Sequence, residues 1–116
     1  MSYESLDVWK RSCRLSCELY MQLSNCRDYG FKDQITRSGL SIPSNIAEGF
    51  ERGSQKEKRQ FLLYARGSAA ELKTQIQIGS RVGFISSKIA PVWLKEATEI
   101  QQMLGGLLNS IDKSAR

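Results

Sequence analysis

The sequence contains no histidine, and this absence removes the commonest general base and a common metal ligand. Nucleophilic catalysis by a serine or cysteine needs such a base, and a two-metal carboxylate site in a helical bundle needs Glu-x-x-His pairs. A glycine-rich phosphate loop and a dinucleotide-binding fingerprint are missing as well. We therefore expect no catalytic residue, no metal and no cofactor.

Cysteine is also scarce. Cys13, Cys17 and Cys26 are an odd number in a chain whose beginning lacks the basic-then-apolar pattern of a secretory signal. We expect reduced thiols that serve as small buried apolar residues. No apolar run approaches the roughly 20 residues that a membrane span needs. These absences favour a cytoplasmic protein without a membrane partner.

The length and the charge of the chain point to its class. At 116 residues it can form one hydrophobic core, and we expect a single domain over residues 1–116. Lysine and arginine number 17 against 12 aspartates and glutamates, which gives a net charge of +5. This excess favours acidic partners, with nucleic acid first and anionic protein or lipid surfaces next.

Apolar residues recur at intervals of three and four along most of the chain, which predicts helices rather than strands. The predicted helices span about residues 5–24 and 31–52, a third begins after Ser54 and reaches roughly to Ser80 or Val82, and a fourth begins after Ser86 or Ser87 and continues through Ile111. Ser54 and Glu57 have the spacing of a capping box at the start of the third helix. Four amphipathic helices with short connections predict an all-α, up-down-up-down four-helix bundle.

Only two prolines occur, and Pro43 lies inside the second predicted helix. Proline removes one backbone hydrogen bond and crowds the carbonyl of Gly39, the residue type that best tolerates such a distortion. We therefore predict a kink at this point. The polar side chains opposite, among them Asn45 and Glu48, are expected to bind the backbone groups that the kink frees, and a binding site there is the alternative.

The first predicted helix carries two separate apolar stripes. The stripe predicted to face the core consists of Leu6, Trp9, Cys13, Cys17 and Tyr20. The second stripe consists of Val8, Leu15 and Leu19. Because four helices share only one core, we predict that the second stripe forms the interface of a homo-oligomer. A broad core face with a few exposed leucines is the alternative.

The third predicted helix carries a basic ridge. Its cations follow one another at intervals of seven, seven and eight residues: Arg59, Arg66, Lys73 and Arg81. They fall within about 80° of one another at 100° per residue, whereas Glu57 and Glu71 lie on the far side. At a rise of ~1.5 Å per residue the ridge is about 30 Å long, which suits a phosphate backbone bound through charge. A solvated face that keeps the protein soluble is the alternative.

A second and weaker basic cluster lies on the first predicted helix and consists of Lys10, Arg11 and Arg14. Neither this cluster nor the ridge shows the interleaved aromatic residues of proteins that stack single-stranded bases.

Several segments resemble one known family. They are QITRSGLSIPSNIAEG, FLLYARGSAAELKTQ, the early Leu6-x-Val8-Trp9 and the turn YGF before Gln34. These segments resemble the bacterial four-helix-bundle proteins that are encoded in intervening sequences of large-subunit ribosomal RNA genes. The same bundle is similar to the accessory protein of diversity-generating retroelements. The resemblance covers nearly the whole chain and implies a ring-shaped homopentamer. For the retroelement branch it also implies a basic surface that engages nucleic acid and a reverse transcriptase.

These observations predict a small, cytoplasmic, oligomeric protein without catalytic activity, which binds the backbone of RNA or DNA through a basic surface as an accessory protein. The alternative is a protein-interaction or scaffold module that does not bind nucleic acid. The spare apolar stripe and the lack of stacking aromatics favour this alternative.

Overall fold

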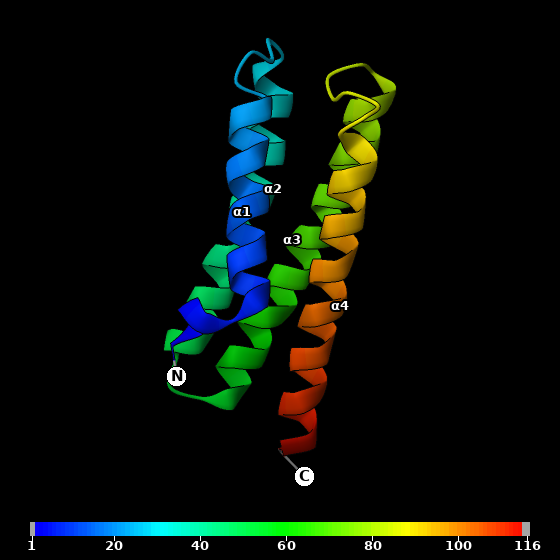
Figure 1. Ribbon diagram of the computed structural model, residues 1–116. Coiled ribbons are helices and arrows are strands. Elements are labelled where there is room, and N and C mark those ends of the chain that lie inside the picture. The colour runs from blue at the N-terminus through cyan, green and yellow to red at the C-terminus, as the bar shows by residue number, and fades with distance from the viewer. Residues whose placement is uncertain (1, 115–116) are drawn as a thin grey trace.

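The computed structural model describes residues 2–114, which form four long helices and no strand. A short 3₁₀ turn, η1 (Tyr3–Ser5), precedes α1 (Asp7–Gln22), α2 (Tyr29–Glu51), α3 (Gln55–Arg81) and α4 (Ala90–Ser114). Each helix runs antiparallel to the next and packs against it, and α4 packs back against α1 (Figure 1). The predicted up-down-up-down bundle is confirmed. The predicted single domain also includes residues 1, 115 and 116, which lie outside the described residues.

Local sequence signals set the helix boundaries. Asp28 accepts a hydrogen bond from the backbone amide three residues on, at the start of α2. Ser54 accepts one from the Glu57 amide at 3.1 Å, so the predicted cap of α3 is confirmed. Ser86 accepts a bond from the amide two residues on, ahead of α4. Pro91 lies in the first turn of α4, where a missing N–H removes no intrahelical bond.

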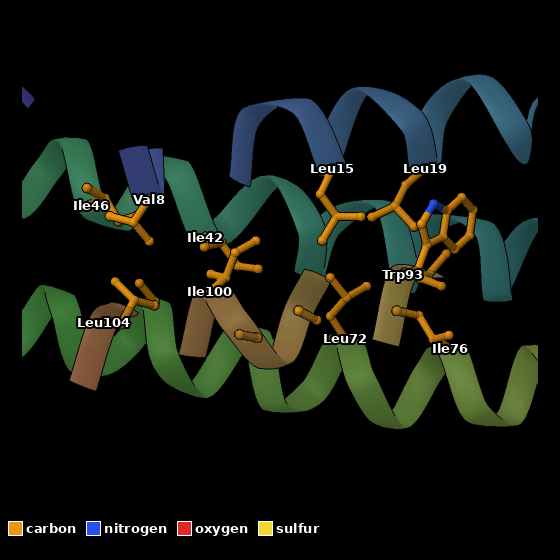
Figure 2. Packing of buried hydrophobic residues seen from close by; sticks show 14 of the residues in the cluster. Val8, Leu15, Leu19, Ile42, Ile46, Leu72, Ile76, Trp93, Ile100 and Leu104 are labelled. Carbon is orange, nitrogen blue, oxygen red and sulfur yellow. The ribbon is translucent and has the colours of Figure 1, made fainter. Parts of the chain in front are cut away.

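One hydrophobic core runs along the axis of the bundle. Figure 2 shows side chains from all four helices meeting there, with the Trp93 indole as the largest. Each helix contributes residues at helical spacing, for example Leu72 and Ile76 of α3 and Ile100 and Leu104 of α4. This matches the periodicity from which the third and fourth helices were predicted.

The prediction that Val8, Leu15 and Leu19 form an oligomer interface is wrong. These side chains are at most 3% exposed and point into the core (Figure 2). The reason is a close approach of α1 to α2, where Leu19 lies against the buried Gly39. A methyl group added at Gly39 would overlap Leu19 Cδ1, so the leucine could keep its present position only beside a glycine.

The stripe that we predicted to face the core lies instead on a flank and the outer side of α1, and only Leu6 and Trp9 pack partly against the core. Trp9 and Cys13 are only partly buried, whereas Cys17 and Tyr20 are exposed. The expectation of buried cysteines is therefore wrong for Cys17. Partial burial raises the pKa of the Cys13 thiol, and the neighbouring Cys17 adds to this shift.

Helix α2 continues through Pro43 without interruption, and the kink itself stays a prediction. Asn45 Nδ2 donates to the Ser41 carbonyl at 2.8 Å, so one polar side chain near Pro43 binds the backbone of its own helix. Glu48 does not: its carboxylate pairs with Arg52 Nη2 at 2.8 Å. Gly39 is required by the approach of α1, a reason that the proline argument did not include.

Among residues 2–114, no helix is long and apolar enough to cross a membrane. Within the same range, no group of three or more cysteine, aspartate and glutamate side chains lies close enough together to hold a metal ion.

Candidate nucleic-acid interface

Helix α3 presents its predicted basic ridge along the flank that faces α4. Arg59 Nε donates to Asp112 Oδ1 at 2.7 Å, and Lys73 Nζ donates to Gln101 Oε1 at 3.0 Å. Both acceptors belong to α4, so these two contacts show which side of α3 carries the ridge.

The acids of α3 lie on other sides of the helix, as predicted. Glu71 accepts a hydrogen bond from Ser38 Oγ of α2 at 3.0 Å. Glu57 takes part in the cap of α3 and pairs with Arg52 at 3.4 Å. Helix α3 therefore contributes only positive charges to the flank next to α4, because its carboxylates point towards α2 and the α2–α3 turn.

The four ridge cations differ in their partners. Arg59 is held by Asp112, whose hydrogen bond raises the pKa of the guanidinium. The pair is 43% and 46% exposed, so solvent screens it and the contact is weak. Arg66 and Arg81 are exposed and form no ion pair within residues 2–114. The ridge thus offers two unpaired cations, while Arg59 and Lys73 are held by side chains of α4. Its role in binding stays a prediction.

Arg11, from the second predicted cluster, links α1 to α4. Its Nε donates to Glu96 Oε2 at 3.0 Å, and its Nη2 donates to Glu99 Oε1 at 2.7 Å. These bonds raise the pKa of Arg11 and lower the pKa of Glu96, because each favours the charged form. Arg11 is therefore not a free surface cation, which leaves Lys10 and Arg14 as the exposed members of that cluster.

A hollow of about 480 Å³ lies next to this ion pair, between α1 and α4. Arg14 and Lys95 line it together with Glu18 and Glu96, and Trp93 Nε1 donates to Glu18 Oε2 at its floor. Because charges of both signs line the hollow, its walls do not select an anion.

The residues of α4 that hold these cations were missed by the sequence reasoning: Glu96, Glu99, Gln101 and Asp112. No local signal could have found them, because each pairs with a residue at least 28 positions away in the chain. The spacing of residues within one helix shows which share a face but not which residues of another helix lie opposite.

Comparisons with known proteins agree with the fold. The crystal structure of a protein of unknown function from the S23 ribosomal protein family of Bacteroides thetaiotaomicron superposes with a TM-score of 0.82. The two sequences are 25% identical, and the match covers 87% of this chain and 97% of the other. No curated protein matches the sequence. The family described as 23S rRNA-intervening sequence protein matches residues 4–106, which include α1, α2, α3 and most of α4. The chain therefore belongs to the 23S rRNA-intervening sequence protein family.

Proposed function

We propose that this protein is a non-catalytic accessory protein that binds the phosphate backbone of RNA or DNA through the basic ridge of α3. One observation carries the proposal: the spacing of four cations places them on one flank of α3, and the carboxylates of that helix lie elsewhere. The net charge of +5 adds a long-range attraction to polyanions.

Binding through this ridge relies on charge and not on reading bases. Arg66 and Arg81 are exposed and meet phosphates first. Arg59 then exchanges Asp112 for a phosphate, because its exposed ion pair is easily replaced. Each cation that meets a phosphate releases counterions, so affinity falls steeply with salt and depends little on sequence.

A salt titration with matched variants tests the proposal. The ridge variant replaces four cations by glutamine: Arg59, Arg66, Lys73 and Arg81. The control variant replaces four exposed cations elsewhere by glutamine: Arg27, Arg37, Lys88 and Lys95. Both variants lower the net charge by four, so they differ only in where on the surface the cations are removed. We expect the ridge variant to lose most of its affinity for a labelled oligonucleotide and most of its salt dependence. Equal affinity of the two variants would contradict the ridge as the binding surface.

The proposal also includes the cytoplasmic location expected from the sequence. The resemblance adds two further elements: assembly as a homopentamer and a reverse transcriptase as protein partner. The outer stripe of α1, with Trp9, Cys17 and Tyr20, replaces the buried stripe as our candidate for the subunit interface. Light scattering on the purified protein measures the assembly directly, and a clean monomer would exclude the ring.

The second candidate function is a protein-interaction or scaffold module. The exposed apolar side chains at the end of α1, Tyr20 at 46% and Met21 at 64%, favour it. This function predicts a protein complex that survives high salt and no shift of an oligonucleotide at low salt.

A further inference from the structure

Two contacts define the face that α3 and α4 form together. Arg59 meets Asp112 near the C-terminal end of α4, and Lys73 meets Gln101 nearer its middle. We call the surface between and around these two contacts the α3–α4 face. The two helices run antiparallel (Figure 1), and these two side-chain contacts join them.

Arg66 lies at the centre of this face. It is seven residues from each of the two paired cations of α3, so it projects from the same side of the helix. On α4 the corresponding position is Gly105, which lies four residues after Gln101 and seven residues before Asp112 and so shares their side of the helix. The two outer cations therefore have a polar partner on α4, whereas the spacing assigns a glycine to the position that faces Arg66.

Nothing inside the described chain requires a glycine at this position. A Cβ atom built on Gly105 meets no other heavy atom within 4 Å. Glycine in a helix interior costs about 1 kcal/mol relative to alanine, and here no close packing offsets that cost. Its effect is to leave open space on the side of α4 that Gly105 shares with Gln101 and Asp112.

Carboxylates are almost absent from the face. Helices α3 and α4 contain five acidic residues, and only Asp112 contacts the face. The other four contact α1, α2 or the α2–α3 turn: Glu57, Glu71, Glu96 and Glu99. The face therefore carries one carboxylate against three cations, and its net positive charge complements a chain of phosphates.

Aromatic residues are absent from the face as well. Helices α3 and α4 contain three of them. The Phe61 ring lies under the Arg52 guanidinium beside α2, and Tyr64 packs edge-on against Phe61. Trp93 is buried and donates to Glu18 of α1. Proteins that bind single strands use aromatic platforms for the unstacked bases, so this face suits a partner whose bases stay paired.

We propose that the α3–α4 face is a track for the backbone of a nucleic-acid duplex and that Arg66 beside Gly105 is the phosphate site at its centre. This inference rests on the proposed function and specifies its ligand. From Arg59 to Lys73 the track extends about 21 Å at 1.5 Å per residue, which is about six base pairs at 3.4 Å each. Helix α3 spaces these cations at regular intervals of seven residues, which suits the regularly spaced phosphates of a duplex.

The sharpest test places a carboxylate at the centre of the track. Gly105→Asp repeats beside Arg66 the arrangement that Asp112 makes beside Arg59, and Gly105→Asn is the neutral control of the same shape. Both side chains enter open space, so both variants should fold, which thermal unfolding followed by circular dichroism checks. We expect Gly105→Asp to weaken binding of a 20-base-pair duplex by about tenfold at 0.1 M salt and to reduce the salt slope by about one. The control should bind within about twofold of the unmodified protein.

The ligand class is tested with four probes of one sequence: duplex DNA, duplex RNA and the two corresponding single strands. Tighter binding of either duplex than of both single strands supports the proposal and identifies the form of the duplex. Single strands that bind as tightly as the duplexes would overturn this inference while leaving the proposed function intact. Equal affinities of Gly105→Asp and Gly105→Asn would overturn the central site. If none of the four probes binds at low salt, the proposed function fails together with it.

Discussion

Replacing Arg11 with methionine should loosen the contact between α1 and α4, which is the least extensive of the helix contacts in the bundle. The Arg11 side chain is 28% exposed and that of Glu96 is 25% exposed, so this ion pair is better shielded than the pairs on the outer surface. Methionine keeps most of the length and apolar packing of the arginine stem, so the substitution isolates the loss of charge and hydrogen bonds.

The expected loss in the free energy of unfolding is about 2 kcal/mol. An exposed ion pair contributes about 0.2–1 kcal/mol, and a hydrogen bond to a charged group in the interior contributes about 1.5–3 kcal/mol. The Arg11 contacts lie between these limits, and removing the guanidinium also leaves Glu96 and Glu99 as like charges side by side. For a domain of this size, the loss corresponds to a fall of about 8 °C in Tm.

Urea unfolding of four proteins measures the contribution: the unmodified chain, Arg11→Met, Glu96→Gln and the double variant. We expect a coupling free energy of about 1 kcal/mol between the two sites, and a smaller value in 1 M salt. Arg59→Met is the matched control, because its ion pair is exposed and its removal should shift the midpoint much less. A coupling free energy near zero, or equal effects of Arg11→Met and Arg59→Met, would refute the assignment of Arg11 as the link between α1 and α4.

Three further predictions concern stability. Gly39→Ala should destabilise the fold by about 1 kcal/mol, since overpacking against α1 outweighs the gain in helix propensity. Gly67→Ala should stabilise the fold, because the added methyl group enters open space. Thermal unfolding should show Tm shifts of opposite sign for the two variants, and shifts of the same sign would contradict the packing argument. Ser54→Ala should cost about 1 kcal/mol in urea unfolding through the lost cap of α3, and an unchanged midpoint would contradict this role. The hydrogen bond from Arg11 lowers the pKa of Glu96 below its ordinary value of 4.5. The contribution of ionised Glu96 to the stability of the fold is therefore present above pH 4.5 and is lost as the pH falls through the pKa of Glu96 in the folded protein. The stability difference between the unmodified chain and Glu96→Gln should therefore shrink in acid, and a difference that persists undiminished at pH 3 would count against it.

Most of the fold could be predicted from the chain because its signals are local. The spacing of apolar residues predicted the third and fourth helices, and Ser54 with Glu57 predicted the start of α3. Caps and periodicity act within a few residues, so they are readable before any tertiary contact exists. The grouping of the ridge cations on one side of α3 is a local property of the same kind.

The orientation of α1 could not be predicted in this way. Both of its stripes are apolar and helically spaced, so its own sequence favours neither as the core face. Which stripe is buried depends on α2, where the absence of a side chain at Gly39 lets Leu19 pack against the helix backbone. A glycine that is needed by another helix looks the same in the sequence as one that accommodates a proline.

The amino-acid sequence alone was sufficient for four helices, their boundaries to within about three residues, the bundle architecture and the positive flank of α3, because each depends on residues close together in the chain. Tertiary packing selected the buried stripe of α1, paired Arg11 with two carboxylates of α4, and placed Asp112 against Arg59. Those outcomes depend on which residues of distant segments meet, and the spacing within a single helix carries no information about its neighbour's register. Whether a cation is available to a ligand is therefore decided by the helix packed beside it.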